Sequence, residues 1–224
     1  MSKHADLGTM ILGALEVRYP LEKQDIGADA RLSKSGMVFE TESYAVKGLG
    51  HLCVLRMKAF LGLMKMETVV LAVKEKDLPL FNLDWVSAAG KETLIAELYD
   101  TQLHPMPEKA LGRFQALKDR DGDLPEREKK PHWYDTILYP CSYDHAGKGL
   151  SQRFNAAAEG YVKEFLAQAE QAPACNAAEK GKKIRSFAET LVKEGGPAVD
   201  TMTKLFGAET AGRVILRHMY GTED

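Results

Sequence analysis

The chain has 224 residues, of which 45% are hydrophobic, and it carries a formal net charge of −2 with a pI near 6.3. This balance excludes the strongly basic surface that nucleic-acid binding requires. Three widely separated cysteines argue against a disulfide framework and a CxxC metal site, and they indicate a reducing compartment. No export leader is evident, and no apolar run reaches the ~20 residues of a membrane span. We therefore expect a cytoplasmic protein without nucleic-acid or membrane partners.

Short apolar or alternating runs bounded by turn residues fill the region from Glu42 to Asp100. Four strands are predicted there: CVLRMKAF, MKMETVVLAV, LFNLDWV and TLIAELYD. Because their connections are short, the strands should be antiparallel neighbours, whereas a parallel pair needs a long crossover. With the flanking segments, a strand-rich sheet is expected over about 36–145.

Helical patterns follow the sheet. A short helix is predicted at 107–118, and WYDTILYP at 133–140 indicates another strand or an irregular wall. After the loop SYDHAGKG, Ser151 is expected to cap a helix, and two more helices should span 179–193 and 197–219. The helical part would occupy about 151–221 of a single domain, 1–224. Strands followed by helices predict an α+β fold, an α/β/α sandwich with a central antiparallel sheet flanked by helices.

The first hairpin of the predicted sheet carries opposite charges. A turn at Leu61-Gly62 would pair Arg56 with Glu67 on one face of the sheet. Arg56 is then either a cation for a bound ligand or simply the ion-pair partner of Glu67.

The second hairpin places carboxylates inside the sheet. A type II′ turn at Gly90-Lys91 would set Asp84 directly opposite Glu97. Two carboxylates about 5 Å apart cannot both ionise cheaply, so one should hold a proton near neutral pH, as a proton donor must. The alternative is a solvated strand face, but the flanks of Asp84 are unusually apolar. Trp85, the next residue, should point into the core on the other side.

Three segments in collinear order resemble the ferredoxin-dependent bilin reductases: DLPLFNLDWVSAAGKETLIAEL at 77–98, PHWYDTILYP at 131–140 and AVDTMTKLFGAETAGRVILRHMYG at 198–221. The resemblance implies an antiparallel sheet between helices. It also implies reduction of a linear tetrapyrrole such as biliverdin by single electrons from reduced ferredoxin, each matched by a proton, with no bound metal or flavin. Asp84 matches the family's central-strand aspartate, which handles the protons of the bilin.

The chain departs from the family pattern at three places. Glu67 stands where the phycocyanobilin-forming branch has a histidine, and Arg56 lies near the position of that branch's glutamate. Gly195-Gly196-Pro197 replaces an aspartate that several branches carry before the last helix. These departures indicate a distant member of the family that is similar to the phycocyanobilin:ferredoxin oxidoreductase branch. A heterotrophic bacterium is one source that would fit such a member.

The predicted site combines acids for proton transfer with cations and an aromatic residue for the substrate. The expected catalytic residues are Asp84, Glu97 and Glu67, and the expected substrate-binding residues are Arg56, His145, Trp133 and Arg217. His145 falls near the family's propionate-binding arginine, and its alternative is a solvated loop histidine. Arg217, with Arg213 and His218, is equally explained by the dipole of the last helix.

The partners follow from the resemblance: a biliverdin-like bilin as substrate and ferredoxin as electron donor, with the chain as a monomer or homodimer. Ferredoxin is acidic, so its docking needs a basic patch. The densest basic runs are Lys180, Lys182, Lys183 and Arg185, then Lys129-Lys130. Two alternatives stay open: a carrier that binds a tetrapyrrole without reducing it, and an enzyme acting on another macrocycle, such as a breakdown product of chlorophyll or a corrin.

Overall fold

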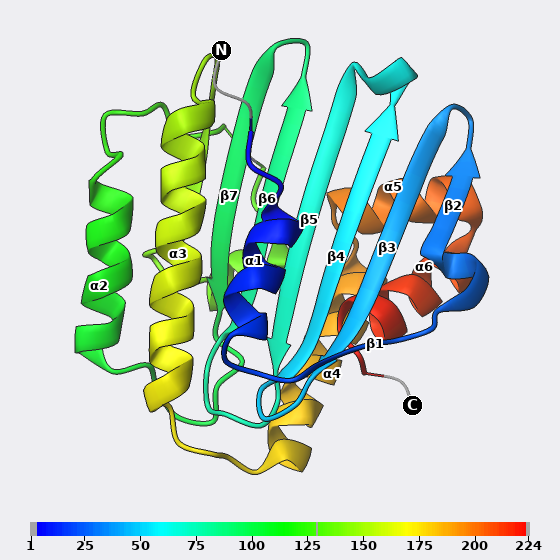
Figure 1. Ribbon diagram of the computed structural model, residues 1–224. Coiled ribbons are helices and arrows are strands. Elements are labelled where there is room, and N and C mark those ends of the chain that lie inside the picture. Colours follow the sequence, from blue (N-terminus) through cyan, green and yellow to red (C-terminus); the bar gives the residue numbers. More distant parts are fainter. Residues whose placement is uncertain (1–3, 129, 223–224) are drawn as a thin grey trace.

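An eight-stranded antiparallel sheet runs through the middle of the molecule (Figure 1). The computed structural model describes residues 4–128 and 130–222. The strands are β1 (Leu21–Lys23), β2 (Arg31–Lys34), β3 (Met37–Val46), β4 (Gly50–Ala59), β5 (Met64–Val73), β6 (Leu80–Ala88), β7 (Lys91–Tyr99) and β8 (Tyr143–Gly147). Their order is β1-β3-β4-β5-β6-β7-β8, and β2 also pairs with β3, beside β1.

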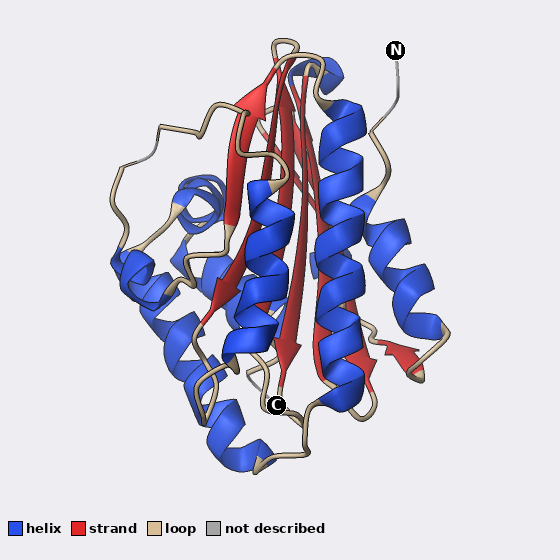
Figure 2. Cartoon of the chain, turned by 90° about the vertical axis from the view of Figure 1, so that its left-hand side faces the viewer, coloured by secondary structure: helices blue, strands red, loops and turns tan. Residues whose placement is uncertain are grey.

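Helices cover both faces of the sheet, as the side view in Figure 2 shows. One face carries α1 (Leu7–Glu16), α2 (Glu108–Asp119) and α3 (Ser151–Gln171). The other carries α4 (Ala177–Glu194), α5 (Pro197–Phe206), α6 (Ala208–Arg213) and the π-helix η4 (Val214–Met219). Three 3-10 turns connect elements: η1 (Gly27–Ala30), η2 (Phe60–Gly62) and η3 (Trp133–Ile137). No helix in the described part of the chain combines the length and apolarity needed to cross a membrane.

The two layers explain why the central strands are apolar at successive positions. In β4, Leu52 and Val54 pack beneath the α1–α3 layer, whereas Cys53 and Leu55 pack beneath the α4–η4 layer. Successive side chains of a strand point to opposite faces, so a strand buried on both faces needs an unbroken apolar run. The predicted α+β sandwich is confirmed.

Several local predictions are wrong. The segment at 133–140 begins with the turn η3, in agreement with the irregular alternative, but the expected loop after it contains β8. The single helix expected over 197–219 is interrupted at Gly207, whose φ of 89° ends α5. Leu150, not Ser151, is the cap residue of α3, because the Ser151 hydroxyl instead donates to Glu92 at 2.7 Å.

Candidate functional site

A cavity of about 320 Å³ lies between β5–β7 and the helices of the α4–η4 layer. Its apolar walls come mainly from the helices: Phe187, Leu191, Pro197, Val199, Ile215 and Met219. Its polar side chains come from the strands, the 127–134 segment and the C-terminal end of η4: Thr68, Asn82, Asp84, Thr93, Glu97, Tyr99, Arg127, His132, Tyr134 and Tyr220. A pocket with apolar walls and a few convergent polar groups is typical of a small-molecule site.

Asp84 is the acid at the centre of this cavity. Its carboxylate accepts hydrogen bonds from the Thr68 hydroxyl and, at 2.6 Å, from the Asn82 amide. Burial raises the pKa of Asp84, and the two hydrogen bonds and the charge of Arg127 only partly offset this effect. Asp84 therefore keeps its proton to a higher pH than an exposed aspartate does.

Asn82 links Asp84 to Glu97. Its amide nitrogen also lies 3.5 Å from Glu97 Oε2, and the Tyr99 hydroxyl donates to that same oxygen at 2.5 Å. The sheet thus presents a continuous polar row, Thr68–Asp84–Asn82–Glu97–Tyr99, to the cavity. Such connected networks hold their members in fixed orientations.

The predicted pairing of Asp84 with Glu97 is wrong by two residues. Asp84 lies opposite Ile95, and Glu97 lies opposite Asn82. The turn is centred on Ala89 and Gly90, whose φ values of 51° and 74° are typical of a type I′ turn rather than the expected II′ turn. Because side chains alternate with a period of two, a shift of two residues leaves both acids on the same face.

Two buried tyrosines, Tyr99 and Tyr220, and the half-buried Tyr134 surround the acids. Burial raises the pKa of Tyr99, Tyr134 and Tyr220, and the charge of Asp84 or Glu97 adds to the effect. Their phenols therefore stay protonated at neutral pH. Tyr99 already donates to Glu97, whereas Tyr134 and Tyr220 can donate hydrogen bonds to a ligand. These tyrosines are not predicted from the sequence, because their pattern matches that of ordinary core aromatics.

Arg127 is a cation on the cavity wall. Its guanidinium makes a bidentate pair with Asp144, at 2.8 and 2.9 Å. A second cavity, of about 330 Å³, shares Arg127 and Glu97 with the first, so the two cavities adjoin at these side chains. Arg127 was also missed, because it lies in a charged loop that resembles an ordinary solvated segment.

Glu67 and Arg56 lie on the opposite face of the sheet. The predicted register of the β4–β5 hairpin is confirmed, with Arg56 opposite Glu67 and 3.1 Å between Arg56 Nε and Glu67 Oε1. Glu67 also accepts the backbone N–H groups of Leu7 and Gly8 at the start of α1. Strand alternation turns Thr68, not Glu67, towards Asp84, so Glu67 has no access to the cavity.

The other predicted substrate contacts also lie outside the cavity lining. His145 is buried in β8 on the α1–α3 face, with Nδ1 3.1 Å from the Pro125 carbonyl, and is not a loop residue. The Trp133 indole donates to the Gly195 carbonyl at 3.3 Å and packs against Phe187. Arg217 is exposed on η4.

The neighbours of Arg217 are explained by a buried acid rather than by the helix dipole. Arg213 donates to Asp29 at 2.7 and 2.9 Å, and His218 Nε2 lies 3.0 Å from the same carboxylate.

The predicted orientation of Trp85 is confirmed. Its side chain faces the α1 side of the sheet and stacks on His4, with 3.8 Å between the ring centroids.

Only part of the expected basic run on α4 is exposed on the surface. Lys180 is fully buried, hydrogen-bonded to the Thr101 hydroxyl at 3.1 Å, and burial lowers its pKa to about 8. Lys182, Lys183 and Arg185 are exposed, although Lys183 bonds the Gln102 carbonyl. In the alternative run, Lys129 lies outside the described residues.

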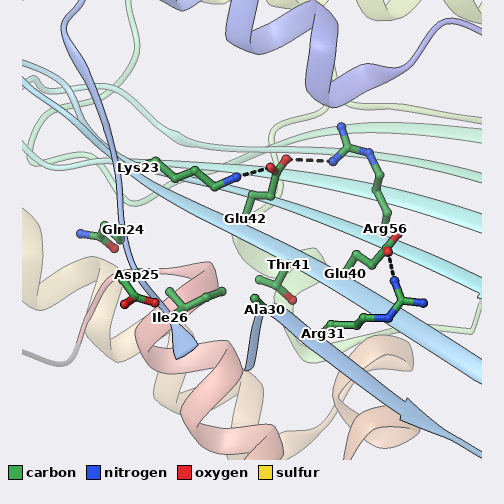
Figure 3. A pocket seen from close by; sticks show the side chains of 10 residues that line it. All are labelled: Lys23, Gln24, Asp25, Ile26, Ala30, Arg31, Glu40, Thr41, Glu42 and Arg56. Carbon is green, nitrogen blue, oxygen red and sulfur yellow. Dashed lines mark hydrogen bonds and ion pairs between the residues drawn. The ribbon is translucent and has the colours of Figure 1, made fainter. Parts of the chain in front are cut away.

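A wider notch of about 650 Å³ opens at the sheet edge, where β1 and β2 leave a gap along β3 (Figure 3). Its cations already have partners: Lys23 and Arg56 bond Glu42, and Arg31 bonds Glu40. It lacks an acid with a raised pKa like the half-buried Asp84, so the Asp84 cavity is the better candidate site. Among the described residues, no group of three or more His, Cys, Asp or Glu side chains could hold a metal ion.

The fold and the cavity define an antiparallel α/β/α sandwich with an acid-lined pocket between the sheet and its C-terminal helices. Among solved structures, the chain is similar to the crystal structure of phytochromobilin synthase from tomato in complex with biliverdin. The TM-score is 0.79 at 14% sequence identity, covering 96% of this chain and 82% of that one. No protein-family model matches the sequence, and neither does any curated protein. The likeness shows a shared fold.

Proposed function

We propose that the chain is an oxidoreductase that binds a biliverdin-like linear tetrapyrrole in the Asp84 cavity and reduces it, with Asp84 as the proton donor. The observation that carries the proposal is the Asp84 carboxyl, whose pKa is raised by burial in a pocket with apolar walls. A carboxylic acid that stays protonated at higher pH can donate a proton to a bound ligand. The shared fold with a synthase crystallised with biliverdin supports this choice of ligand.

The shape of the site supports an extended ligand. The Asp84 cavity, at about 320 Å³, adjoins the cavity of about 330 Å³ on the far side of Glu97 and Arg127. A linear tetrapyrrole is long and largely apolar, so it could span both spaces with its rings against the apolar walls. Asp84 and Glu97 would face its polar pyrrole edge, and Arg127, on the cavity lining, would pair with a propionate group.

The proposed reaction consumes two electrons and two protons per reduced double bond. One electron from reduced ferredoxin converts the bilin to a radical anion, and Asp84 transfers its proton to it, leaving an aspartate anion and a neutral radical. A second electron and a second proton complete the reduction. Water reprotonates Asp84 between these steps.

The test follows visible absorption while purified protein is mixed with biliverdin and then given reduced ferredoxin without oxygen. The wild type should shift the spectrum on mixing and again on reduction. Asp84→Asn should bind biliverdin similarly but lose turnover by about 10²–10⁴-fold, the usual contribution of a general acid. Asp25→Asn, an exposed acid on the edge notch, is the matched control and should react like the wild type. Full turnover by Asp84→Asn would show that another group supplies the proton.

A non-catalytic tetrapyrrole carrier is the second candidate. Gly196, Pro197 and Ala198 line the cavity where several branches of the resembled family carry an aspartate, so the second proton has no obvious acid there. A carrier would shift the biliverdin spectrum on mixing and show no further change with reduced ferredoxin. The absence of any shift on mixing would exclude both candidates.

A further inference from the structure

Three hairpin turns lie together at one end of the sheet (Figure 1). The β2–β3 turn is built on Ser35 and Gly36, and the β6–β7 turn on Ala89 and Gly90. Each of these two turns joins a small residue to a glycine, and glycine adopts a positive φ without steric cost. The β4–β5 turn between them differs, because its four residues, 60–63, read Phe-Leu-Gly-Leu. We call residues 60–63 the apolar tip.

The apolar tip is exposed and conformationally costly. Phe60, Leu61 and Leu63 are 66%, 107% and 77% exposed, and Val17 is the only other large hydrophobic residue so exposed in the described chain. Phe60 and Leu61 also have positive φ values of 52° and 57°, which bulky residues rarely adopt. Strained, exposed apolar residues of this kind are retained where a function uses them.

Lysines surround the apolar tip. Lys58 and Lys65 are exposed and lie directly opposite each other at its base, an arrangement that repels within the sheet. Lys34 and Lys91 are exposed on the neighbouring turns. Residues 34–37, 58–65 and 88–91, which form the three turns, contain these four lysines and no acidic residue. Lys58 also lies 4.0 Å from Glu40 on β3, which offsets part of its charge. The four lysines together still favour an anionic partner at this end of the molecule.

The spacing of the apolar and basic groups fits a lipid bilayer. At about 3.3 Å per strand residue, Lys58 and Lys65 lie about 7–10 Å behind Leu61. Interfacial segments bury their apolar side chains about 5–10 Å below the headgroups, which leaves lysines at the level of the phosphates. A protein partner is less well matched, because a stable interface buries about 800 Å² on each side and a narrow convex tip offers much less.

We propose that this end of the molecule docks on anionic membranes, with the apolar tip inserted at the interface and the four lysines on lipid phosphates. The inference is independent of the reaction proposed at Asp84. It differs from the sequence-based expectation that the chain has no membrane partner, and the experiment below decides between the two. Interfacial docking needs no spanning helix, since the tip only enters the headgroup region.

The experiment is flotation of the purified chain with vesicles of phosphatidylcholine alone or mixed with phosphatidylglycerol. The wild type should float with the mixed vesicles and only weakly with the neutral ones. Leu61→Asn with Leu63→Ser should lower the partition coefficient by at least about tenfold, because two apolar anchors are lost. Asparagine is chosen at position 61 because it tolerates a positive φ. Lys58→Gln with Lys65→Gln should lower binding to the mixed vesicles by about thirtyfold.

Matched controls remove similar groups elsewhere. Val17→Ser deletes the exposed apolar side chain after α1, and Lys47→Gln deletes an exposed lysine at the β3–β4 connection; both should float like the wild type. Circular dichroism checks that every variant folds. Failure of the wild type to float with mixed vesicles, or flotation of the tip variant equal to wild type, would overturn the proposal. Tip-dependent binding of an acidic protein such as ferredoxin, without vesicle binding, would assign the tip to a protein partner instead.

Discussion

Removing the Glu67 carboxylate should destabilise the protein strongly without stopping its chemistry. Glu67 is 7% exposed at its side chain and accepts the Leu7 and Gly8 N–H groups at 2.7 and 3.1 Å, with Arg56 Nε also 3.1 Å away. Glu67→Ala leaves two buried donors at the start of α1 unsatisfied, at about 1–3 kcal/mol each. Arg56 is 25% exposed and keeps Asp6 and Glu42 as partners, so the lost ion pair adds little. We therefore expect a loss of about 3–5 kcal/mol.

Glu67→Gln removes the charge and one of the two acceptor oxygens but keeps the size of the side chain. Leu7 and Gly8 donate to different carboxylate oxygens, so the single amide oxygen of glutamine keeps only one of these two bonds. The loss at neutral pH should therefore be about 1–3 kcal/mol, the cost of one unsatisfied donor. Burial raises the pKa of Glu67 in the folded state, with its N–H donors and Arg56 opposing the shift. As the pH rises above the unfolded pKa, the unfolded chain releases this proton first, so the wild type loses stability relative to Glu67→Gln up to the folded pKa.

Urea unfolding followed by circular dichroism measures these differences. The control is Glu170→Ala, which removes a 54%-exposed partner of Arg18 and should cost less than about 1 kcal/mol. Equal losses for Glu67→Ala and Glu170→Ala would refute the argument that the carboxylate anchors α1. Because Glu67 lies across the sheet from the cavity, Glu67→Gln should also keep wild-type turnover of biliverdin, whereas a catalytic Glu67 would not.

Two other buried charges make stability depend on pH. Burial lowers the pKa of Lys180 in the folded state to about 8. Between that pH and the higher pKa of the unfolded chain, the unfolded state binds more protons, so the free energy of unfolding should rise with pH. Lys180→Met should abolish this rise, as measured by urea unfolding at pH 7–10. Hydrogen bonds from Arg213 and His218 lower the pKa of Asp29, so its contribution should be lost as the pH falls through that pKa. Asp29→Asn should cost about 1–2 kcal/mol at pH 7, limited by the 40% exposure of Arg213, and an unchanged unfolding midpoint would contradict this.

Features set by neighbouring residues could be predicted from the sequence. The central strands, the helix at 107–118 and the antiparallel sandwich follow from apolar periodicity and short connections. The pairing of Arg56 with Glu67 and the opposite orientations of Asp84 and Trp85 follow from the two-residue alternation of strands. Even the two-residue error in the β6–β7 register kept Asp84 and Glu97 on one face.

Features that depend on long-range packing needed the tertiary structure. Alternation shows that Glu67 and Thr68 face opposite ways, but only the position of α1 shows which of them is covered and which shares a cavity with Asp84. Arg127 and Tyr220 reach that cavity from segments far from the strands, and no local pattern marks them. Sequence period determines the face on which a side chain lies, whereas the element that packs on that face depends on burial across the whole chain.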